Sequence, residues 1–168
     1  SSPGAGTKSH LTGEMLKLRA DIQMVHVPFR GAGPAAQAVL AKQIEVGSVA
    51  ISAAEPLVQG GQLRALAVTS EKRWFSMPQV PTMIESGYPG FVSDTFNALL
   101  APAGTPPEVV AILVKATREA MQKPEVVAAS RRVGFEVVAG EPEALTKRIA
   151  TEIPLVKELV EKAGIKPE

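Results

Sequence analysis

The sequence predicts an α/β fold with a largely parallel sheet, and three observations support this prediction. Segments with helical periodicity alternate with short runs rich in β-branched residues, and turns containing glycine or proline separate them. Hydrophobic residues make up 45% of the 168 residues, which suffices for a buried core. Aromatic residues contribute only 4%, so that core must be aliphatic. Repeated strand–loop–helix units of this kind favour parallel strands covered by helices.

The first half of the chain contains helices and strands in alternation. After a small-residue loop, they are expected at residues 8–20 (helix), 22–28 (strand), 35–42 (helix), 44–50 (strand), 52–59 (helix) and 63–69 (strand). Leu11, Met15 and Leu18 give the first helix an apolar face, and Gly60 follows the third helix as a stop signal. The strands are identified by their β-branched content.

The second half begins with a proline-rich loop around Trp74. Its elements are expected at residues 82–86 (helical turn), 91–101 (extended run), 106–120 (helix), from 124 (short helix), 135–138 (strand) and 142–163 (helix). Thr105 and Glu108 have the spacing of a capping box, with Thr105 as the N-cap residue. Pro154 predicts a kink in the last helix.

Composition excludes several classes of function. The formal net charge of +1 and the lack of a basic stripe argue against a nucleic-acid partner. The chain has no cysteine, and so no thiol nucleophile or disulfide. No apolar run reaches the ~20 residues of a membrane helix, and no signal peptide is present. Because the opening residues 1–4 resemble a loop within a protein, we expect this chain to be part of a longer one.

A candidate anion site is the first loop, which comes directly before a helix. Helix N-termini offer unpaired N–H groups and a positive dipole, and small residues let a ligand approach the backbone. The candidate contacts are Ser2, Gly4, Ala5, Gly6, Thr7 and Ser9. An ordinary capped strand–helix turn remains an equal alternative. A phosphate-binding P-loop is not indicated, since Thr7 separates Gly6 from Lys8.

Two further loops follow predicted strands, and ligands of α/β proteins bind at the carboxyl ends of strands. The second loop offers Phe29, Arg30 and Gly31; the guanidinium could clamp a carboxylate, although a solvated surface arginine is the commoner case. Ser52 of the third loop could cap a helix or touch the ligand. Asp94 is a carboxylate expected near these loops.

The residues of a catalytic site are not assembled in this sequence. His10 and His26 are the only histidines, and a predicted helix separates them without any metal-ligand spacing. Structural roles are the commoner outcome for both. No serine lies in a Gly-x-Ser-x-Gly context. The sequence by itself therefore offers no assembled catalytic set and no metal-ligand set.

Six segments in order carry a resemblance to a known family. They are SSPGAG at 1–6 with His10 and Leu11 behind it, VPFRG at 27–31, GQLRALAVT at 61–69, VPTMIESG at 80–87, LLAPAGTP at 99–106 and AGIKPE at 163–168. In this order and spacing they resemble the Bug-type receptors of tripartite tricarboxylate transporters, and the resemblance covers the whole chain.

The resemblance implies a periplasmic receptor with the two-lobed, type II periplasmic-binding fold (Venus flytrap). Such receptors capture a small carboxylate or dicarboxylate and pass it to a membrane permease. The resemblance also implies that the protein is not an enzyme and has no cofactor and no metal. Residues 1–95 would form lobe II, and residues 96–168 would complete lobe I, whose N-terminal part and signal peptide lie outside this chain. The family's ligand-holding backbone motif corresponds to residues 1–7.

Two departures from the family pattern bear on the ligand. Ser48-Val49-Ala50 replaces Phe-Asp-Asn, and Phe96-Asn97-Ala98 replaces Trp-Phe-Gly. These changes predict a less polar ligand than citrate. Alternative functions are a Bug-like sensory or partner-docking module, and an α/β enzyme that uses the glycine-rich loop for an anionic substrate. The apolar faces of the helices after residue 105 also predict a covering chain segment or self-association.

Overall fold

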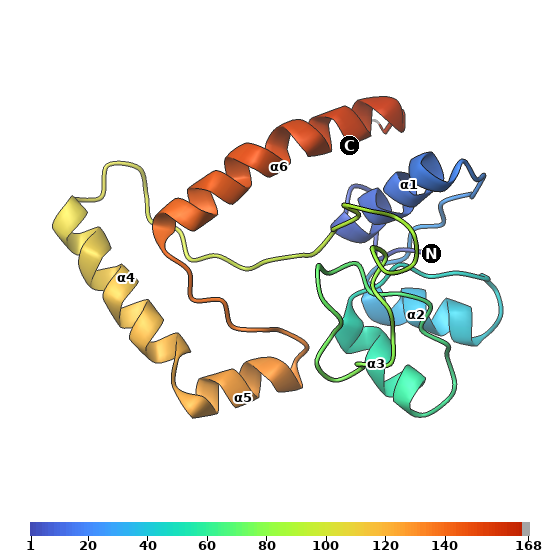
Figure 1. Ribbon diagram of the computed structural model, residues 1–168, viewed down its shortest axis with the longest axis horizontal. Coiled ribbons are helices and arrows are strands. Elements are labelled where there is room, and N and C mark those ends of the chain that lie inside the picture. Colours follow the sequence, from blue (N-terminus) through green and yellow to red (C-terminus); the bar gives the residue numbers. More distant parts are fainter. Residues whose placement is uncertain (166–168) are drawn as a thin grey trace. The chain divides into compact units, whose positions relative to one another are not determined.

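Six helices organise the structure, a computed structural model that describes residues 1–165. In chain order they are α1 (Lys8–Ala20), α2 (Ala32–Leu40), α3 (Ile51–Gln59), α4 (Pro107–Met121), α5 (Pro124–Arg132) and α6 (Pro142–Lys162) (Figure 1). Every predicted helix is present, and the expected bounds of the first are confirmed at both ends. The last three residues of the AGIKPE segment lie outside the described residues.

The predicted strands form no ladder within residues 1–165. Residues 22–28, 44–50, 63–69, 91–101 and 135–138 are extended or irregular, and pairing is limited to two isolated bridges. Both bridges, Ser2 with Pro28 and Val68 with Thr82, are parallel. Helix α1 lies between the partners of the first bridge, as expected for a strand–helix–strand connection, whereas a loop connects the partners of the second. A strand is stabilised by hydrogen bonds to its neighbours, and these extended segments have too few neighbours to form ladders. The prediction of regular strands is therefore wrong for this chain.

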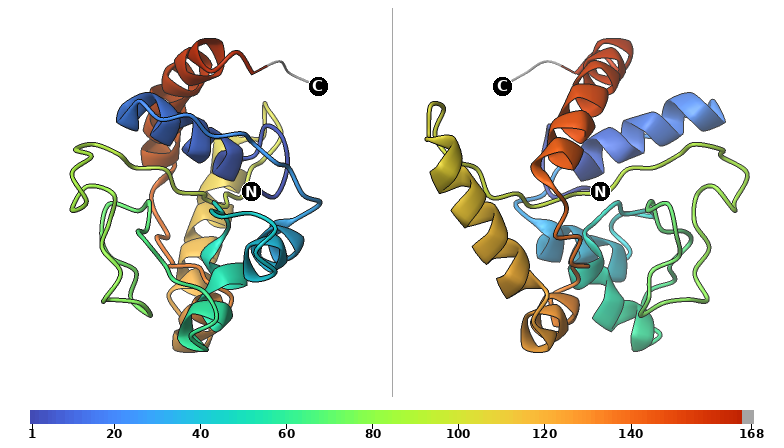
Figure 2. Two further views of the ribbon diagram at one scale, coloured as in Figure 1. Left: turned by 90° about the vertical axis from the view of Figure 1, so that its right-hand side faces the viewer. Right: turned by 60° about the vertical axis from the view of Figure 1, so that its left-hand side comes forward.

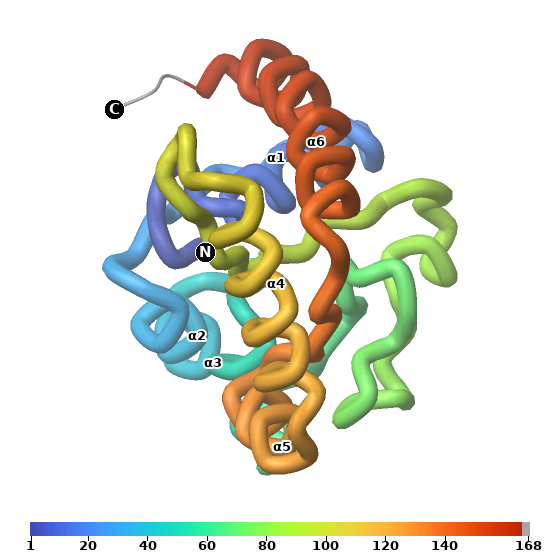
Figure 3. Tube along the Cα trace, turned by 90° about the vertical axis from the view of Figure 1, so that its left-hand side faces the viewer, coloured from blue at the N-terminus to red at the C-terminus, as the bar shows by residue number. Residues whose placement is uncertain are grey.

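The chain divides into two compact units. The first comprises Ser1–Thr95 together with the chain from Val156 on, and the second comprises Phe96–Leu155. Within the first unit, α2 and α3 pack against each other, and the two views in Figure 2 show them side by side. Within the second unit, α4 leads directly into α5, as the tube in Figure 3 shows.

The core of the first unit is small and aliphatic except for one ring. Its buried apolar residues are Leu11, Ala35, Ala36, Ala38, Met77, Val80 and Phe91. Phe91 has no exposed surface, and the ring of Tyr88 meets it edge-on at 6.2 Å between centroids. The three alanines give α2 a flat buried face against which the neighbouring backbone can pack closely.

Helix α1 is held at both ends and along its buried side. The Thr7 hydroxyl caps the start by accepting the His10 N–H, and Asp21 ends the helix in a left-handed conformation (φ 49°). In the middle, the Thr12 and Ser93 hydroxyls lie 2.6 Å apart and are both buried. This pair ties α1 to the extended segment that follows Phe91.

We expect Thr12→Val to lower the free energy of unfolding by about 1–3 kcal/mol, because it leaves the buried Ser93 hydroxyl without this partner. Urea denaturation of the two proteins measures the change. The double variant Thr12→Val/Ser93→Ala should recover part of the loss, since both polar groups are then gone. A double variant no more stable than Thr12→Val would contradict this account.

A capping box occurs in the structure, but not where the sequence predicts it. Thr82 and Glu85 bond reciprocally, with the Thr82 N–H donating to Glu85 Oε2 (2.8 Å) and the Glu85 N–H to Thr82 Oγ1 (3.1 Å). The predicted N-cap Thr105 instead donates its hydroxyl to the Pro102 carbonyl, and α4 begins at Pro107 without a side-chain cap. The second proline shifts the helix start by one residue, because its fixed φ suits the first helical position.

The second unit leaves large apolar side chains exposed. They are Phe96, Leu99, Leu100, Val109, Ile112, Leu113, Val133, Phe135, Val138, Ile149, Ile153 and Leu155. Polar contacts hold parts of the unit together, including an ion pair between Arg118 and Glu141 and the Arg148 guanidinium 4.3 Å from the centre of the Phe96 ring. The apolar faces predicted for α4 and α6 thus exist, and they are uncovered in this chain.

Candidate functional site

The first loop lies between two other backbone segments. Ser2 donates its N–H to the Val27 carbonyl (3.3 Å) and accepts the Phe29 N–H (2.9 Å). The Gly31 N–H donates to the Pro3 carbonyl (3.0 Å), which extends the same set of hydrogen bonds. These bonds follow a parallel pairing, so the first and second predicted site loops run side by side.

The third segment, residues 46–48, pairs with Ser1 on the edge of the first segment that faces away from residues 27–31. The Ser48 N–H donates to the Ser1 carbonyl (2.9 Å), and the Ser1 amino group donates to the Val46 carbonyl (2.6 Å). Gly47 fits closely between them, since a Cβ there would lie 3.0 Å from Val39 and 3.1 Å from Ser1. The segment at residues 1–3 therefore lies between the other two segments, residues 27–31 and 46–48, and all three run in the same direction.

The loop beyond Pro3 turns through bonds among its own residues. Thr7 donates its hydroxyl to the Gly4 carbonyl (2.8 Å), and the Gly4 N–H donates to Ser2 Oγ (3.2 Å). Gly6 has φ +70°, a left-handed conformation that favours glycine, and a Cβ placed there would meet nothing within 4 Å. Its N–H donates to His10 Nδ1 (3.1 Å). The backbone turn is thus fixed, while Ala5 and Gly6 remain exposed.

The side chains of two histidines, His10 and His26, contact this loop. The rings of His10 and His26 stack with 3.7 Å between centroids and 13° between planes. His26 Nε2 lies 2.6 Å from the Ser2 hydroxyl, which is 1% exposed, and His10 is 8% exposed. Glu14, one turn further along α1, places Oε1 3.8 Å from His10 Nε2 and binds Lys17 at 2.8 Å.

The environment lowers the pKa of His26 from its ordinary value of 6.5. Burial is the largest cause of this lowering. Electrostatic interactions with His10, the Ser1 amino group and Lys17 lower the pKa further, and the Glu14 carboxylate opposes them. The neutral ring is therefore the form that the folded protein favours at position 26.

We expect the protein to lose stability as the pH falls below about 6.5. Above that pH, His26 is neutral in both the folded and the unfolded state. Below it, the unfolded chain binds a proton at His26 more readily than the folded chain does, so protonation favours unfolding. The loss of stability ends when the pH falls below the lowered pKa of the folded state. Urea denaturation between pH 7.5 and 5 measures the loss. His26→Gln, whose amide can still meet Ser2, should show a shallower pH dependence, and an unchanged slope would count against this cause.

The structure brings together some of the predicted site residues and separates others. Ser2, Gly4, Gly6 and Thr7 share the first loop, and the segment from Phe29 to Gly31 runs beside it. Arg30 is exposed at this edge. Ser9 begins α1, whereas Ser52 is an exposed residue of α3. Asp94 follows Ser93, whose hydroxyl lies 2.6 Å from that of Thr12 in α1.

Sequence reasoning assigned His10 and His26 only structural roles and did not connect them with the loop. Fifteen residues, among them most of α1, lie between the two histidines, so no local spacing indicates that they stack. The position of His10 three residues after the N-cap Thr7 was an available signal, because a residue there can reach back to the loop's N–H groups.

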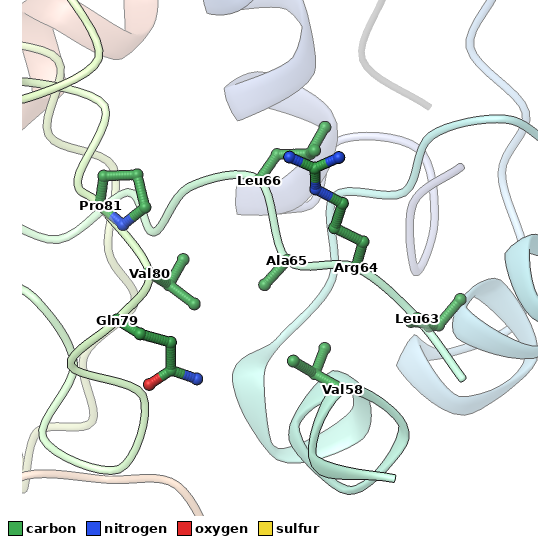
Figure 4. Close-up of a pocket in the computed structure, with 8 residues that line it drawn as sticks. All are labelled: Val58, Leu63, Arg64, Ala65, Leu66, Gln79, Val80 and Pro81. Atoms are coloured by element: carbon green, nitrogen blue, oxygen red, sulfur yellow. The ribbon is translucent and has the colours of Figure 1, made fainter. Parts of the chain in front are cut away.

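A hollow of about 440 Å³ lies elsewhere in the first unit. It is lined by Val58, Leu63, Arg64, Ala65, Leu66, Gln79, Val80 and Pro81 (Figure 4). Figure 4 shows Val58 of α3 on one side of the segment 63–66, with Gln79 and Val80 across from it. None of the predicted site residues belongs to this hollow. Most of its lining side chains are apolar, and Arg64 is the one cation among them.

Residues 1–165 form neither a metal cluster nor a membrane-spanning helix. No group of three or more His, Asp or Glu side chains there could hold a metal ion. Likewise, none of the helices in that part of the chain is both long and apolar enough to cross a membrane.

Comparison with known proteins places this geometry in context. Residues 1–165 match the family described as "Tripartite tricarboxylate transporter family receptor". Protein BugT of Bordetella pertussis is 34% identical over 161 residues, which are 96% of this chain and 49% of BugT. The chain thus spans about half the length of this curated relative.

Solved structures agree with the sequence comparison. A protein of R. palustris solved with adipate superposes with a TM-score of 0.81 at 28% identity, over 97% of this chain and 55% of that one. MatC of Rhodopseudomonas palustris, solved with bound malate, gives a TM-score of 0.78 at 29% identity, over 95% of this chain and 56% of MatC. The similarity extends over both compact units, because it covers almost the whole chain.

Proposed function

Because the chain belongs to the tripartite tricarboxylate transporter receptor family, we propose that it is the carboxylate-gripping part of an extracytoplasmic solute-binding protein that serves a membrane permease. The predicted periplasmic-binding-protein-like fold is confirmed, since periplasmic receptors superpose on nearly the whole chain. Adipate and malate, the ligands named for two of these receptors, define the class of ligand. The site of action is then the periplasm.

The observation that carries the proposal is the meeting of three backbone segments at the start of α1. The exposed residues Ala5 and Gly6 let a ligand oxygen approach the main chain, and the N-terminus of the 13-residue helix supplies a positive dipole. Arg30, at the edge of the neighbouring segment, adds a full positive charge. A small carboxylate fits this combination better than a cation or a neutral solute does.

The same geometry supports a receptor rather than an enzyme. The loop hydroxyls of Ser2 and Thr7 are engaged with backbone groups, and His26 meets a serine whose oxygen is buried. A nucleophile must be accessible to its substrate, and Ser2 is not. The proposed chemistry is therefore reversible binding without turnover.

Isothermal titration of the full-length protein with adipate and malate tests the proposal. Binding of either dicarboxylate, with no heat from adipamide at the same concentration, is the expected result, because the diamide has the same length but no charge. Equal heats from adipate and adipamide would argue against carboxylate recognition. Absence of binding by adipate, malate and citrate would overturn the proposed ligand class.

The exposed apolar faces of the second unit suggest what else the receptor contains. We infer that residues 1–95 belong to lobe II and residues 96–168 to lobe I, although the structure groups the chain from Val156 on with the first unit. We further infer that additional chain of the longer receptor covers Ile112 and its neighbours. Ile112 is 67% exposed, and the chain spans about half of BugT. Alternatively, a second copy of the chain covers these apolar faces by self-association. Sedimentation analysis of this chain and of the full-length protein separates them, since only self-association gives dimers of both.

A further inference from the structure

The segment at residues 1–3 begins partway along the two segments that flank it. Its first hydrogen bonds reach Val27 on one side and Val46 on the other. The flanking segment that contains Val27 is already extended from residue 22 on. A backbone edge therefore continues beyond Ser1, beside the path of any residues that precede it in a longer chain.

Val27 and Val46 direct unpaired N–H groups toward that path. In a parallel pairing, the N–H and the C=O of a bonded residue point toward the same neighbouring strand. Their carbonyls accept hydrogen bonds from Ser2 N–H and from the Ser1 amino group, so their N–H groups point to the same side. Neither N–H has a hydrogen-bond partner within residues 1–165, and the same holds for the carbonyl of Val25, the next acceptor along that edge.

Apolar side chains are exposed at the same place. Val25 is 89% exposed and Val46 is 47% exposed, although β-branched residues usually pack against neighbours in a sheet. Successive side chains of an extended segment point to opposite faces, and the ring of His26 is stacked on His10 of α1. The Val25 side chain therefore lies on the face away from α1.

We propose that these edges receive the residues that directly precede Ser1 in the longer receptor, as a β-strand paired in parallel on both sides. The observed pairing, repeated backward along the chain, gives the register. The residue directly before Ser1 donates its N–H to the Val25 carbonyl and accepts the Val27 N–H. The residue before that one accepts the Val46 N–H, and its side chain lies beside that of Val25.

Connection and length favour the continuation of the chain itself as the occupant. The peptide bond to Ser1 places these residues at the edges, so no loop has to be closed to bring them there. The matched region is only 49% of BugT, so a receptor of that length has ample chain outside it. A strand from a second copy would have to end against the Ser1 amino group, which donates to the Val46 carbonyl at 2.6 Å.

The proposed strand leads without interruption into the first loop. Pairing on both sides fixes the direction in which the chain enters Pro3 and Gly4, so the strand is a rigid support for that loop. The inference goes beyond the proposed function and does not depend on what the loop binds. Its tests therefore use no ligand, and they stand or fall separately from carboxylate binding.

Hydrogen exchange of the full-length protein, resolved by residue with NMR, tests the pairing. The amides of Val27 and Val46 should exchange as slowly as those of Phe29 and Ser48, which are hydrogen-bonded to the first segment in this structure. The expected protection is about 100-fold or more over an unpaired amide. Exchange of the Val27 and Val46 amides at the rate of unpaired amides would overturn the inference.

Cross-linking of the full-length protein identifies the occupant. Cysteines are placed at only two positions, Val25→Cys and the second residue before Ser1. A bifunctional thiol reagent that spans about 5 Å, the spacing of paired strands, should join them within one molecule. Mass spectrometry after proteolytic digestion detects the product.

A shift of one position supplies the matched control for the cross-link. When the second cysteine is moved to the residue directly before Ser1, its side chain lies on the opposite face from Val25, and the yield should fall strongly. Cross-links between two molecules would show that a second copy occupies the edge. That result would overturn the inference, as would equal yields, or no cross-link at all, from the two positions.

Discussion

Replacing Phe91 by alanine should lower the free energy of unfolding by about 3–5 kcal/mol, the largest change expected for any single substitution in the first unit. Phe91 is 0% exposed, and it is the largest fully buried side chain among the described residues. Three of the other six buried apolar residues are alanines, so few core side chains are large enough to fill the space that the ring leaves. Urea denaturation followed by the fluorescence of the sole tryptophan, Trp74, measures the loss.

A matched phenylalanine in the same unit provides the control. Phe75 is 40% exposed and packs beside the Trp74 ring at 4.6 Å between centroids. We expect Phe75→Ala to cost about 1 kcal/mol, mainly the aromatic contact. If Phe91→Ala does not fold, Phe91→Leu should fold with a smaller loss. Equal losses for Phe75→Ala and Phe91→Ala would mean that the core is not where the structure places it.

Replacing Gly6 by alanine should weaken adipate binding by about tenfold or more, which corresponds to 1.4 kcal/mol or more. Gly6 has φ +70°, which an L-residue adopts at a cost of about 1–2 kcal/mol, so the substitution displaces the loop. The added methyl group would also project into the open space over the loop, where the carboxylate is proposed to lie. Titration calorimetry measures the affinity.

Gly61 offers an unusually close control for this substitution. It has φ +68°, and a Cβ there would likewise meet nothing within 4 Å, but it follows α3 rather than preceding α1. Gly61→Ala should therefore destabilise the protein about as much as Gly6→Ala does, without weakening adipate binding. A similar loss of affinity in both variants would show that the effect is general destabilisation and not a property of the loop.

The helices could be predicted from sequence because their signals are local. Thr7 caps α1, Gly60 follows α3, and prolines begin α4, α5 and α6. The strands could not, because a ladder depends on neighbours that may be far away in the chain. Residues 63–69 have the composition of a buried strand, yet only Val68 makes a bridge. The capping box at Thr105 failed for a local reason, since Pro107 competed with Pro106 for the first helical position.

The site was predictable to the level of backbone segments and not to that of side chains. Parallel pairing of loops that follow strands could be expected from the fold class, and the bond from Phe29 to Ser2 agrees with it. The stacked histidines could not, because their contact depends on how α1 lies against the segment before Pro28. Ser52 shows the same limit. The sequence suggests it as an N-cap residue, but α3 begins one position earlier, at Ile51, and Ser52 is its second residue.

The sparse pairing of the extended segments has a consequence for handling the protein. Between Arg64 and Ala67 the backbone has no bridge, and the side chain of Leu66 is 63% exposed. Unpaired, apolar strand edges can template the addition of a strand from another molecule. When produced as this chain alone, the protein should therefore be prone to edge-to-edge aggregation that grows with concentration. A charged residue at Leu66, on the exposed side of that edge, should act as a gatekeeper against it.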